Sequence, residues 1–513
     1  MQQRLYPLGQ QDFQGIINEG RVYVDKTMHA HRLITTNKYY FLSRPRRFGK
    51  SLFVSMLETI FLGKQELFKG MYIYDKWSFE VYPIISFSFN TLAYENNQLD
   101  ESIKKRLHYI AAYYDIELKT EKTKEKFEEL IKELQNKYNK NVVILIDEYD
   151  KPLIDYLDKD NLHKALENRD ILKSFYSVLK DADPYLKLVF ITGVSKFSKV
   201  SIFSDLNNLT DLSLATAYNE ICGISQKELE ENFNDELEMY DREKIRSWYN
   251  GYKWDVGGAT VYNPFSLLSF FVNHGKYQNF WYTTGTPTFL MKMCREQHLY
   301  KFEEISINQD DLGNFDIENL KIIPILFQTG YLTIKSENPI LRNYKLTFPN
   351  QEVRESYLRN LADQYIGSNS YSSSNILESL LESLINQDAE LLKMSINQAF
   401  AQIPYDLWQR ENEQYYHAIV HLLFSLLNVY IFSEVHTQQG RADAIVIYED
   451  QIYCMEFKLD QSAQDAIDQI KSRGYTERFR DTGKPMHHIG INFSSTQRKV
   501  DDIIWEHGFG LIG

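Results

Sequence analysis

The triplet Gly49-Lys50-Ser51 could bind phosphate, and it ends the basic segment Arg44-Pro45-Arg46-Arg47-Phe48. Backbone N–H groups at the start of a helix bind phosphate oxygens, and the helix dipole favours an anion there. In such a site Lys50 would reach the terminal phosphates of a nucleotide, and the Ser51 hydroxyl would bind Mg²⁺. The alternative is that the segment is a basic loop that caps an ordinary helix.

The residues around the triplet predict the elements that such a site needs. The apolar run Tyr39–Leu42 predicts a short buried strand, and we expect a helix with an apolar face from Lys50 onward. Strand, loop and helix in this order are the layout of a phosphate-binding loop. The usual pattern has a glycine five positions before Gly49, where this chain has Arg44. We expect the whole segment from Arg44 to Ser51 to bind the nucleotide.

A second candidate for chemistry is the pair Asp147-Glu148, which follows the apolar run Val142–Ile146. The run predicts a parallel strand that is buried on both faces. Its carboxyl end would face the phosphate loop, because ligands bind at the carboxyl ends of strands in open α/β sheets. Asp147 would then support Mg²⁺ through water, and Glu148 would polarise the attacking water. Two acidic residues in this place favour hydrolysis over storage of a nucleotide.

The remainder of residues 1–216 predicts a scaffold for these motifs. Further strands are expected at Tyr82–Phe89 and Leu186–Gly193, and helices at Glu101–Leu118, Glu125–Tyr138 and Ala165–Lys180. The alternation predicts an α/β fold, with a parallel sheet covered by helices on both faces. Thr192 would lie where a polar group contacts the γ-phosphate, although a threonine can equally just end a strand.

The segment before the phosphate loop allows two interpretations. Residues Tyr6 to Thr27 could wrap the base of a bound nucleotide, or they could only pack against the surface of the domain. Within this segment, Asp25-Lys26-Thr27 predicts the start of a helix.

The middle of the chain, from about Ala217, changes to mixed helices rich in aromatic residues. We expect a helical lid and spacer there, in which Gln328–Ile334 and Tyr344–Phe348 could form the hairpin of a small winged domain. The serine-rich segment Ser368–Ser374 has the composition of a linker. The predicted domains are therefore residues 1–216, 217–370 and 375–513.

A third group of residues, Asp443, Glu456 and Lys458, lies on two predicted strands near the end of the chain. The strands Ala442–Tyr448 and Ile452–Lys458 would form a hairpin with a short turn. Asp443 and Glu456 then lie almost opposite each other, and Lys458 shares the face of Glu456 because strand side chains alternate. The three side chains would therefore converge on one patch of the sheet.

Such a patch can hold a metal ion for phosphodiester hydrolysis. Two carboxylates and a backbone carbonyl bind a hard divalent cation such as Mg²⁺, with Mn²⁺ as an alternative. The cation polarises a phosphodiester and lowers the pKa of its bound water, which Lys458 would position. The alternative is a solvent-facing ladder of salt bridges.

Three observations favour the metal site over the ladder. The residues directly before Asp443 are Gly440-Arg441-Ala442. Glu456 and Lys458 stand in an otherwise apolar strand, where unpaired charges would be costly. A helix with one apolar face follows, and it places Gln469 near the same end of the sheet.

A further metal ligand could come from neighbouring elements. Glu413 stands one helical turn before His417 and could complete the metal site, although a salt-bridged surface glutamate is an equal alternative. Glu434, on a predicted strand, could do the same.

The composition limits the class of protein. The formal net charge of −13 argues against a sequence-blind nucleic-acid coat, which would carry a basic surface. The three cysteines have neither metal-ligand spacing nor a disulfide pattern, which indicates a reducing compartment. The N-terminus lacks the apolar core of a signal peptide, and no apolar run is long enough to cross a bilayer. We expect a soluble cytoplasmic protein without a membrane partner.

Several of these segments together resemble a known bacterial family. Arg44–Leu52, Tyr23–Thr27 and Leu145–Asp150 resemble AAA-like ATPases that carry a C-terminal domain of the PD-(D/E)XK nuclease superfamily. Gly440–Asp443 with Glu456-Phe457-Lys458 looks like the active-site motif of that domain. The resemblance covers essentially the whole chain. It implies a P-loop NTPase fold that binds ATP and Mg²⁺, followed by a restriction-endonuclease-like α/β domain with a metal-dependent nuclease fold.

Two functions fit these residues. The first is an ATP-dependent nuclease, in which ATP changes the lid and licenses cleavage of nucleic acid, with DNA favoured over RNA. The second is a regulatory switch whose nuclease-like domain binds a partner or nucleic acid without cleaving it. A substrate-remodelling ATPase ranks last, because no unfoldase pore motif is present. In AAA-type rings a neighbouring subunit supplies an arginine to the active site, so a homo-oligomer is a further possible partner. No arginine of this sequence can be assigned that role.

Overall fold

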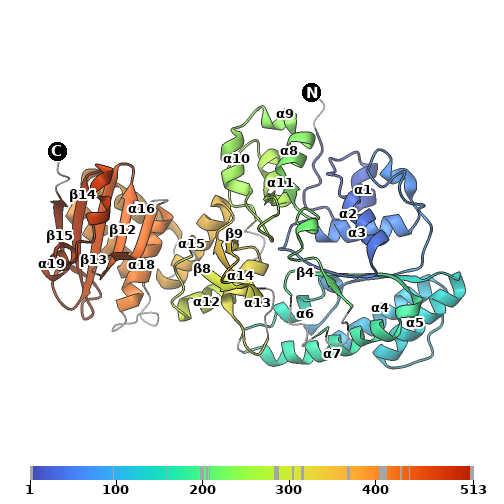
Figure 1. Cartoon of the computed structure of the whole chain (residues 1–513). Helices are drawn as coiled ribbons and strands as arrows, with labels where there is room; N and C mark the ends of the chain where they lie inside the picture. Colours follow the sequence, from blue (N-terminus) through green and yellow to red (C-terminus); the bar gives the residue numbers. More distant parts are fainter. Residues whose placement is uncertain are drawn as a thin grey trace. The chain divides into compact units, whose positions relative to one another are not determined.

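The computed structural model divides into two compact units, one of residues 1–285 with 303–354 and one of residues 286–302 with 355–513 (Figure 1). The residues that the structure describes are 4–95, 98–158, 160–196, 202–203, 206, 208–281, 288–302, 305–312, 317–366, 370–403, 413–427, 430–437 and 440–508.

The first unit is built on a five-stranded sheet in the order β2-β3-β4-β1-β5. Its strands are β1 (Tyr39–Ser43), β2 (Ile84–Ser88), β3 (Val142–Asp147), β4 (Leu186–Gly193) and β5 (Thr210–Asp211). Every neighbouring pair is parallel. Because β4 lies between β1 and β3, the phosphate loop after β1 and the acidic pair after β3 flank the end of β4.

Helices cover both faces of this sheet. They are α1 (Phe13–Asn18), α2 (Thr27–Thr36), α3 (Lys50–Phe61), α4 (Leu99–Tyr113), α5 (Thr123–Tyr138), α6 (Lys151–Ile154) and α7 (Leu162–Asp181). Figure 1 shows α2 and α3 on one face, and α4, α5 and α7 on the other. All residues of β1 and β3 are buried, which explains why these strands appear in the sequence as unbroken apolar runs. The predicted α/β fold is confirmed.

A helical region with an aromatic core follows within the same unit. It contains β6 (Ile224–Ser225), α8 (Gln226–Asn232), α9 (Asn234–Leu237), α10 (Arg242–Tyr249), β7 (Val261–Tyr262) and α11 (Pro264–Val272). Helix α11 begins where the Asn263 side chain accepts hydrogen bonds from the N–H groups of Phe265 and Ser266, with Pro264 at the first helical position. These are favourable residues for a helix start, and they fix where Phe265 stands.

A small antiparallel sheet completes the first unit. Its parts are β8 (Ile305–Asn308), α13 (Gln309–Leu312), α14 (Ile322–Gln328), β9 (Thr333–Asn338) and β10 (Asn343–Thr347), and the strand order is β8-β10-β9. The predicted hairpin is confirmed, but the strand expected from Gln328 starts only at Thr333. Gln328 instead ends α14, and Gly330 turns the chain at a φ of 90°. A Cβ on Gly330 would lie 2.6 Å from Pro45, so the turn packs against the phosphate loop.

The second unit is built on another five-stranded sheet, in the order β11-β12-β13-β14-β15. Its strands are β11 (Tyr430–Thr437), β12 (Gly440–Tyr448), β13 (Gln451–Leu459), β14 (Met486–Ser494) and β15 (Lys499–Gly508). Strands β13 and β14 are parallel, and the other neighbours are antiparallel. This mixed α/β arrangement is consistent with the predicted nuclease-like domain.

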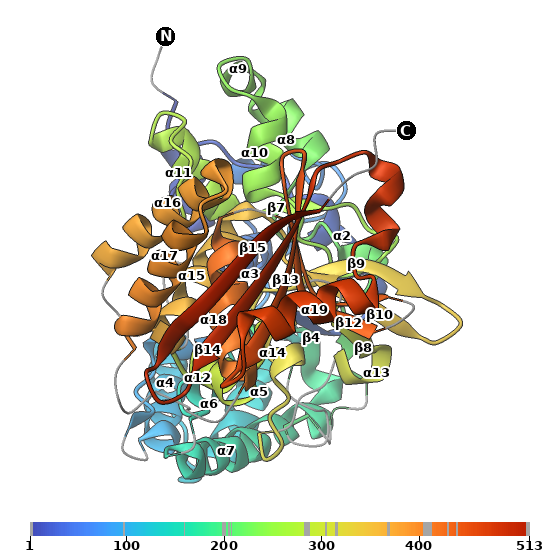
Figure 2. The ribbon, with the colours of Figure 1, turned by 90° about the vertical axis from the view of Figure 1, so that its left-hand side faces the viewer.

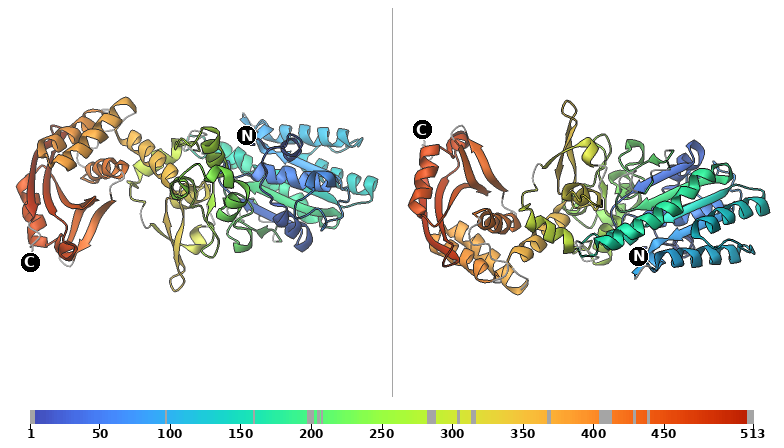
Figure 3. Two further views of the ribbon diagram at one scale, coloured as in Figure 1. Left: turned by 90° about the horizontal axis from the view of Figure 1, so that it is seen from above. Right: turned by 90° about the horizontal axis from the view of Figure 1, so that it is seen from below.

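The helices of the second unit are α12 (Thr288–Glu296), α15 (Gln351–Ile366, from Glu355 on), α16 (Ser370–Asn386), α17 (Ala389–Ala401), α18 (Glu413–Leu426) and α19 (Ala463–Arg473). Helix α19 lies across the strands in Figure 2, and Figure 3 shows α18 on the opposite face. A Cβ on Gly490 would lie 2.2 Å from the Ala463 carbonyl oxygen, so glycine in β14 allows α19 to approach the sheet.

The predicted linker is wrong for residues 370–374, which form the first turns of α16. Its serines are weak helix formers, but the following residues bury Ile376, Leu380 and Leu384, and this packing overrides their preference. The second compact unit takes up the chain again at Glu355, and the predicted domain boundaries stay a prediction. In the described part of the chain, no helix is both long enough and apolar enough to cross a membrane.

Candidate nucleotide and metal sites

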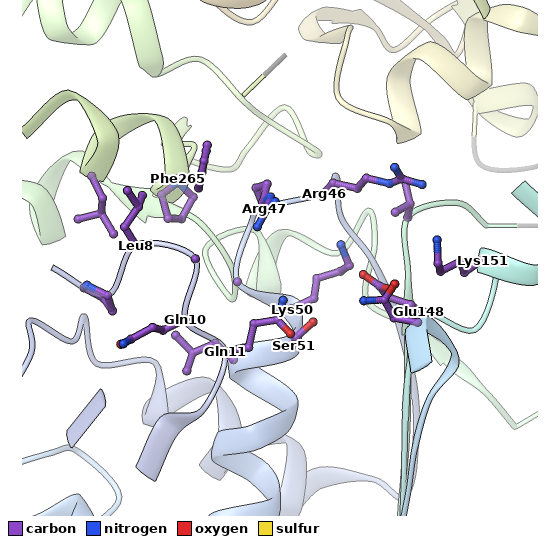
Figure 4. A pocket seen from close by; sticks show the side chains of 18 of the residues that line it. Leu8, Gln10, Gln11, Arg46, Arg47, Lys50, Ser51, Glu148, Lys151 and Phe265 are labelled. Atoms are coloured by element: carbon purple, nitrogen blue, oxygen red, sulfur yellow. The ribbon is translucent and has the colours of Figure 1, made fainter. Parts of the chain in front are cut away.

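A pocket of about 300 Å³ in the first unit contains the predicted phosphate loop (Figure 4). It lies at the carboxyl ends of the parallel strands, as expected for a ligand site in such a sheet. Its lining residues come from the N-terminal segment, the phosphate loop, the loop after β3 and α11: Pro7, Leu8, Gly9, Gln10, Gln11, Arg46, Arg47, Gly49, Lys50, Ser51, Leu52, Asn90, Glu148, Asp150, Lys151, Ile154, Val194, Pro264, Phe265 and Leu268.

The phosphate loop has the conformation of an anion-binding turn. Gly49 precedes the first residue of α3 at a φ of 92°, and Arg47 also has a left-handed φ of 68°. The Lys50 ammonium donates to the carbonyls of Arg44 and Pro45, both at 2.9 Å. Burial lowers the pKa of Lys50, and the nearby Asp147 opposes that shift. The loop therefore holds Lys50 in place beneath the helix N-terminus, where a phosphate would bind.

The acidic pair lies beside this loop. Asp147 is buried, which raises its pKa to about 6, while a hydrogen bond from Ser51 opposes the rise. Two buried atoms, Asp147 Oδ1 and Thr192 Oγ1, have no hydrogen-bond partner among the described residues. Buried polar groups are almost always hydrogen-bonded, so these two atoms beside the phosphate loop are candidate contacts for a ligand. Mg²⁺ takes oxygen ligands and often keeps water between itself and the protein, and Ser51 with Asp147 fits that preference.

Glu148 points into the pocket from a strained position, since its φ is 52°. Asp150 holds this turn in place, because its carboxylate accepts hydrogen bonds from Ser195 N and Oγ at 2.6 Å and from Val194 N at 3.0 Å. The loop after β3 is thus fastened to the end of β4. Sequence reasoning did not assign a role to Asp150, although its place two residues after the acidic pair was a signal.

Three residues of the predicted phosphate loop do not line the pocket, and Arg44 is the first of them. The Arg44 side chain is fully buried and donates to the carbonyls of Ser43, Ser213 and Tyr218. Its guanidinium lies 4.1 Å from the centroid of the Trp254 ring. The two terminal nitrogens of Arg44 thus already bind protein carbonyls, while its Nε has no hydrogen-bond partner among the described residues, and phosphate binding by Arg44 stays a prediction. Its role is to join the phosphate loop to the helical region.

Phe48 and Pro45 are likewise packing residues. Phe48 is buried, with ring centroids 4.7 Å from Tyr252 and 5.4 Å from Trp254. Pro45 meets the turn at Gly330. Only Arg46, Arg47, Gly49, Lys50 and Ser51 of the predicted segment line the pocket. Asp147 and Thr192 lie behind its wall, at the ends of β3 and β4.

The N-terminal segment lines the pocket together with α11. Pro7 to Gln11 form one wall, and Pro264, Phe265 and Leu268 stand beside them. Figure 4 shows Leu8 and Phe265 next to each other, and the Arg47 guanidinium lies 5.0 Å from the centre of the Phe265 ring. The sequence could not identify Phe265, because only the folded chain brings α11 to the phosphate loop.

The second candidate site lies in the other unit, within β12 and β13, directly beyond the last paired residues of their hairpin. Their hairpin pairs Tyr448 with Gln451 and ends at Ala444 with Met455, so Asp443 and Glu456 are next along the two strands. The predicted placement of Asp443 opposite Glu456 is confirmed. Beyond the last pair, the Asp443 carboxylate accepts the N–H of Phe457 at 2.7 Å.

Glu456 is the centre of a buried hydrogen-bond network. Its Oε1 accepts from Lys458 at 3.2 Å and from the side-chain amide of Gln469, while Lys458 also donates to Gln469 Oε1 at 2.7 Å. The Glu456 side chain is only 2% exposed. Burial first, and then the neighbouring Asp443, raise the pKa of Glu456 to about 7, against the pull of Lys458. A solvent-facing ladder of salt bridges is therefore excluded.

The two carboxylates suit a hard divalent cation, which prefers oxygen ligands. His417 lies on α18 with Nε2 3.9 Å from Asp443 Oδ2. The side chains of Glu413 and Glu434 lie outside the described residues, so their proposed part in metal binding stays a prediction. No group of three His, Cys, Asp or Glu side chains able to hold a metal occurs among the residues that are described.

Comparisons with known proteins match this division of the chain. Residues 7–203, from the N-terminal segment to the loop after β4, match the family model described as predicted AAA-ATPase. Residues 411–503, from α18 into β15, match the PD-(D/E)XK nuclease superfamily. An "Uncharacterized protein in vnfD 5'region" from Azotobacter chroococcum mcd 1 is 36% identical over 521 residues, which cover 99% of each chain.

The chain belongs to the family of predicted AAA-ATPases with a C-terminal PD-(D/E)XK nuclease-superfamily domain. Each family match contains one of the two candidate sites. The match over residues 7–203 also includes the N-terminal segment that lines the pocket, while Phe265 lies outside it.

Proposed function

We propose that this AAA-ATPase-like protein binds and hydrolyses ATP in the pocket, and that ATP controls metal-dependent cleavage of nucleic acid at Asp443, Glu456 and Lys458. The observation that carries the proposal is that one chain holds both sets of residues with side chains brought together by the fold. The phosphate loop and Glu148 line one pocket, and in the other unit two strands and α19 bring together two carboxylates, a lysine and a glutamine.

In the pocket, the triphosphate would lie on the start of α3, where Lys50 leaves the loop carbonyls for a phosphate oxygen. Ser51 and Asp147 would hold Mg²⁺, which neutralises phosphate charge and orients the nucleotide. Glu148 would orient the attacking water, and Thr192 would meet the γ-phosphate side of the site. The apolar wall of Leu8, Phe265 and Leu268 would hold the base, as stacking and apolar contacts do in most ligand sites.

In the second site, Asp443 and Glu456 would bind Mg²⁺ or Mn²⁺, which lowers the pKa of a bound water and polarises the phosphodiester. Lys458 would hold that water or balance the charge that develops on the phosphate. Gln469 would hold the side chains of Lys458 and Glu456 close together, because it hydrogen-bonds to both. A polymer of phosphodiesters, with DNA as the first substrate to test, is the substrate class that this chemistry serves.

The test is cleavage of labelled single-stranded DNA, double-stranded DNA and RNA with Mg²⁺ or Mn²⁺. Wild type is compared with Asp443→Ala and with Asp450→Ala, which removes an exposed carboxylate at the tip of the same hairpin. We expect cleavage by wild type and Asp450→Ala, and none by Asp443→Ala. Equal cleavage by all three would place the activity elsewhere.

A regulatory switch is the second candidate function, and the closed network around Glu456 favours it. Lys458 and Gln469 already occupy Glu456 Oε1, as they would in a domain that binds without cleaving. ATP hydrolysis together with metal-independent binding of DNA, and no cleavage in any condition, would establish this function instead.

A further inference from the structure

We propose that Lys151, together with Arg46, supplies within the same chain the positive charge that ATP hydrolysis needs at the γ-phosphate. The site would then be complete without an arginine from a second copy. This inference rests on the proposed ATP hydrolysis and assigns a role to a residue that the motifs do not include.

The two ends of the pocket differ in character. Leu8 and Phe265 lie at one end, and Glu148 and Lys151 at the other, with Lys50 between them (Figure 4). The base of a nucleotide suits the apolar end, and its triphosphate then extends over Lys50 toward Glu148. The γ-phosphate, which is farthest from the base, would lie at the end that holds Lys151.

Lys151 is placed by the turn that follows the acidic pair. Its backbone N–H donates to the Glu148 carbonyl at 3.1 Å, and it begins α6. This hydrogen bond holds the backbone of Lys151 next to that of Glu148. A residue that orients water and a residue that balances charge are fixed by one tight turn, which is the preorganisation that electrostatic catalysis requires.

Asp155 forms ion pairs with both cations when no phosphate is bound. Its carboxylate lies 3.0 Å from Lys151 Nζ and 3.8 Å from an Arg46 guanidinium nitrogen. The Tyr94 hydroxyl donates to the same carboxylate at 2.5 Å, which fixes its direction. The ion pairs are partly exposed, at 24% for Lys151, 39% for Arg46 and 32% for Asp155. Pairs of this kind contribute little free energy, so a highly charged phosphate can take the cations from Asp155.

The other pocket-lining cations have different tasks. Lys50 is bound to the carbonyls of the phosphate loop, where the β- and γ-phosphates pass. Arg47 lies over the Phe265 ring, toward the apolar end. Among the described residues that line the pocket, Arg46 and Lys151 are therefore the cations at the end of Glu148.

The charge is needed at a defined step. The water oxygen forms a bond to the γ-phosphorus, and the bond from that phosphorus to the β–γ bridging oxygen breaks. The electron pair of that bond stays on the ADP oxygen, and a water proton passes to Glu148 and then to solvent. Negative charge builds up on the bridging and outer γ-oxygens, and Lys151 with Arg46 would stabilise it.

The test is ATP turnover by Lys151→Met beside a matched control, Lys132→Met. Lys132 also pairs with an acidic residue four positions away, Glu128, but it stands on α5 away from the pocket. We expect kcat to fall about 100-fold in Lys151→Met, the size of effect seen when one electrostatic stabiliser is removed. The affinity for a fluorescent ATP analogue should change less than about threefold, because the effect is confined to the transition state.

Two further readouts separate a catalytic role from a structural one. Wild type should trap ADP with aluminium fluoride and Mg²⁺, a mimic of the transition state, and Lys151→Met should not. Mixing Lys151→Met with Glu148→Gln should restore no activity if each site uses its own lysine. Restored turnover in the mixture would overturn the inference, because Lys151 would then act on a neighbouring copy.

Failure of this inference and failure of the proposed function have different signatures. Turnover by wild type with equal turnover by Lys151→Met would reject the role of Lys151 alone. ATP binding without turnover in wild type would reject the proposed hydrolysis, and the role of Lys151 with it.

Discussion

The two candidate sites differ in whether their buried polar atoms already have hydrogen-bond partners within the protein. In the ATPase-like pocket, Asp147 Oδ1 and Thr192 Oγ1 are buried without a hydrogen-bond partner among the described residues. In the nuclease-like site, the oxygens of Glu456 already accept hydrogen bonds from Lys458, Gln469 and the N–H of Asp443. We therefore expect a ligand to supply the missing partners at the first site, whereas a ligand of the second site would have to displace groups of the protein.

This difference follows from where each site lies. Loops at the ends of parallel strands leave room for a ligand, and their backbone N–H groups face outward. The second site lies within a sheet, where a buried carboxylate must find partners in the protein to avoid a large desolvation cost. We therefore expect the pocket to bind ATP readily, and cleavage to need a change that opens the network around Glu456.

The largest expected effect would come from Lys458→Ala, which separates the two sites. Cleavage should fall by about 1000-fold or more, because Lys458 is the cation closest to the proposed metal. ATP turnover should stay within about twofold of wild type. Lys471→Ala is the control, since it removes a lysine of α19 that pairs with Glu506 at the surface. Loss of ATP turnover in Lys458→Ala would show that the two sites are not separable.

Lys50→Ala should have the opposite effect, a loss of ATP turnover with cleavage retained. ATP turnover should fall about 100-fold, because the ammonium that spans the phosphates is lost. The rise in melting temperature caused by saturating ATP should disappear, since a ligand stabilises the folded state only when it binds. Metal-dependent cleavage measured without ATP should be unchanged, and a matching loss there would contradict the independence of the nuclease-like site.

Glu456→Gln tests whether the buried, charged carboxylate of Glu456 lowers the stability of the folded protein. The pKa of Glu456 is raised to about 7, above its ordinary value of 4.5, so burial favours its protonated form. Its contribution to stability is present below pH 4.5 and is lost as pH rises through 7.

Without metal, Glu456→Gln should therefore be more stable than wild type at pH 8, by about 1 to 3 kcal/mol. The difference should shrink toward pH 5. Thermal unfolding in EDTA at both pH values measures it, and a wild type that is the more stable protein at pH 8 would contradict the pKa assignment.

The smallest expected effect concerns Asp147 in the open pocket. Its pKa is raised to about 6, so at pH 5.5 about three quarters of it would be protonated. Protonation removes a negative charge from the Mg²⁺ site, so the affinity for Mg²⁺-ATP should fall about fourfold between pH 8 and pH 5.5. Asp147→Asn serves as the reference for the titration of ATP itself, and its affinity should vary less over the same range.

The sequence predicted the placement of the candidate site residues where that placement is set by local structure. The bounds of β4 match the predicted strand, and the closeness of Asp443 to Glu456 follows from the register of one tight hairpin. Alternation and hairpin register act over a few residues, so they can be read without knowing the rest of the fold.

Features that depend on distant packing could not be predicted. Phe265 reaches the pocket only because α11 packs over the phosphate loop, and Arg44 is withdrawn from it by carbonyls far along the chain. The serine-rich segment became helix because of apolar residues that follow it. Residue type indicated that Arg44 could bind phosphate, but only the folded chain shows that its guanidinium is buried against protein carbonyls.

The most direct test of the account is the initial rate of DNA cleavage with Mg²⁺, measured with and without ATP for wild type, Lys50→Ala and Asp443→Ala. We predict that ATP changes the wild-type rate by about tenfold or more, within the range of coupling between sites. Lys50→Ala should cleave at a rate that ATP does not alter, and Asp443→Ala should not cleave. A wild-type rate that is the same with and without ATP would contradict the claim that the pocket controls the nuclease-like site.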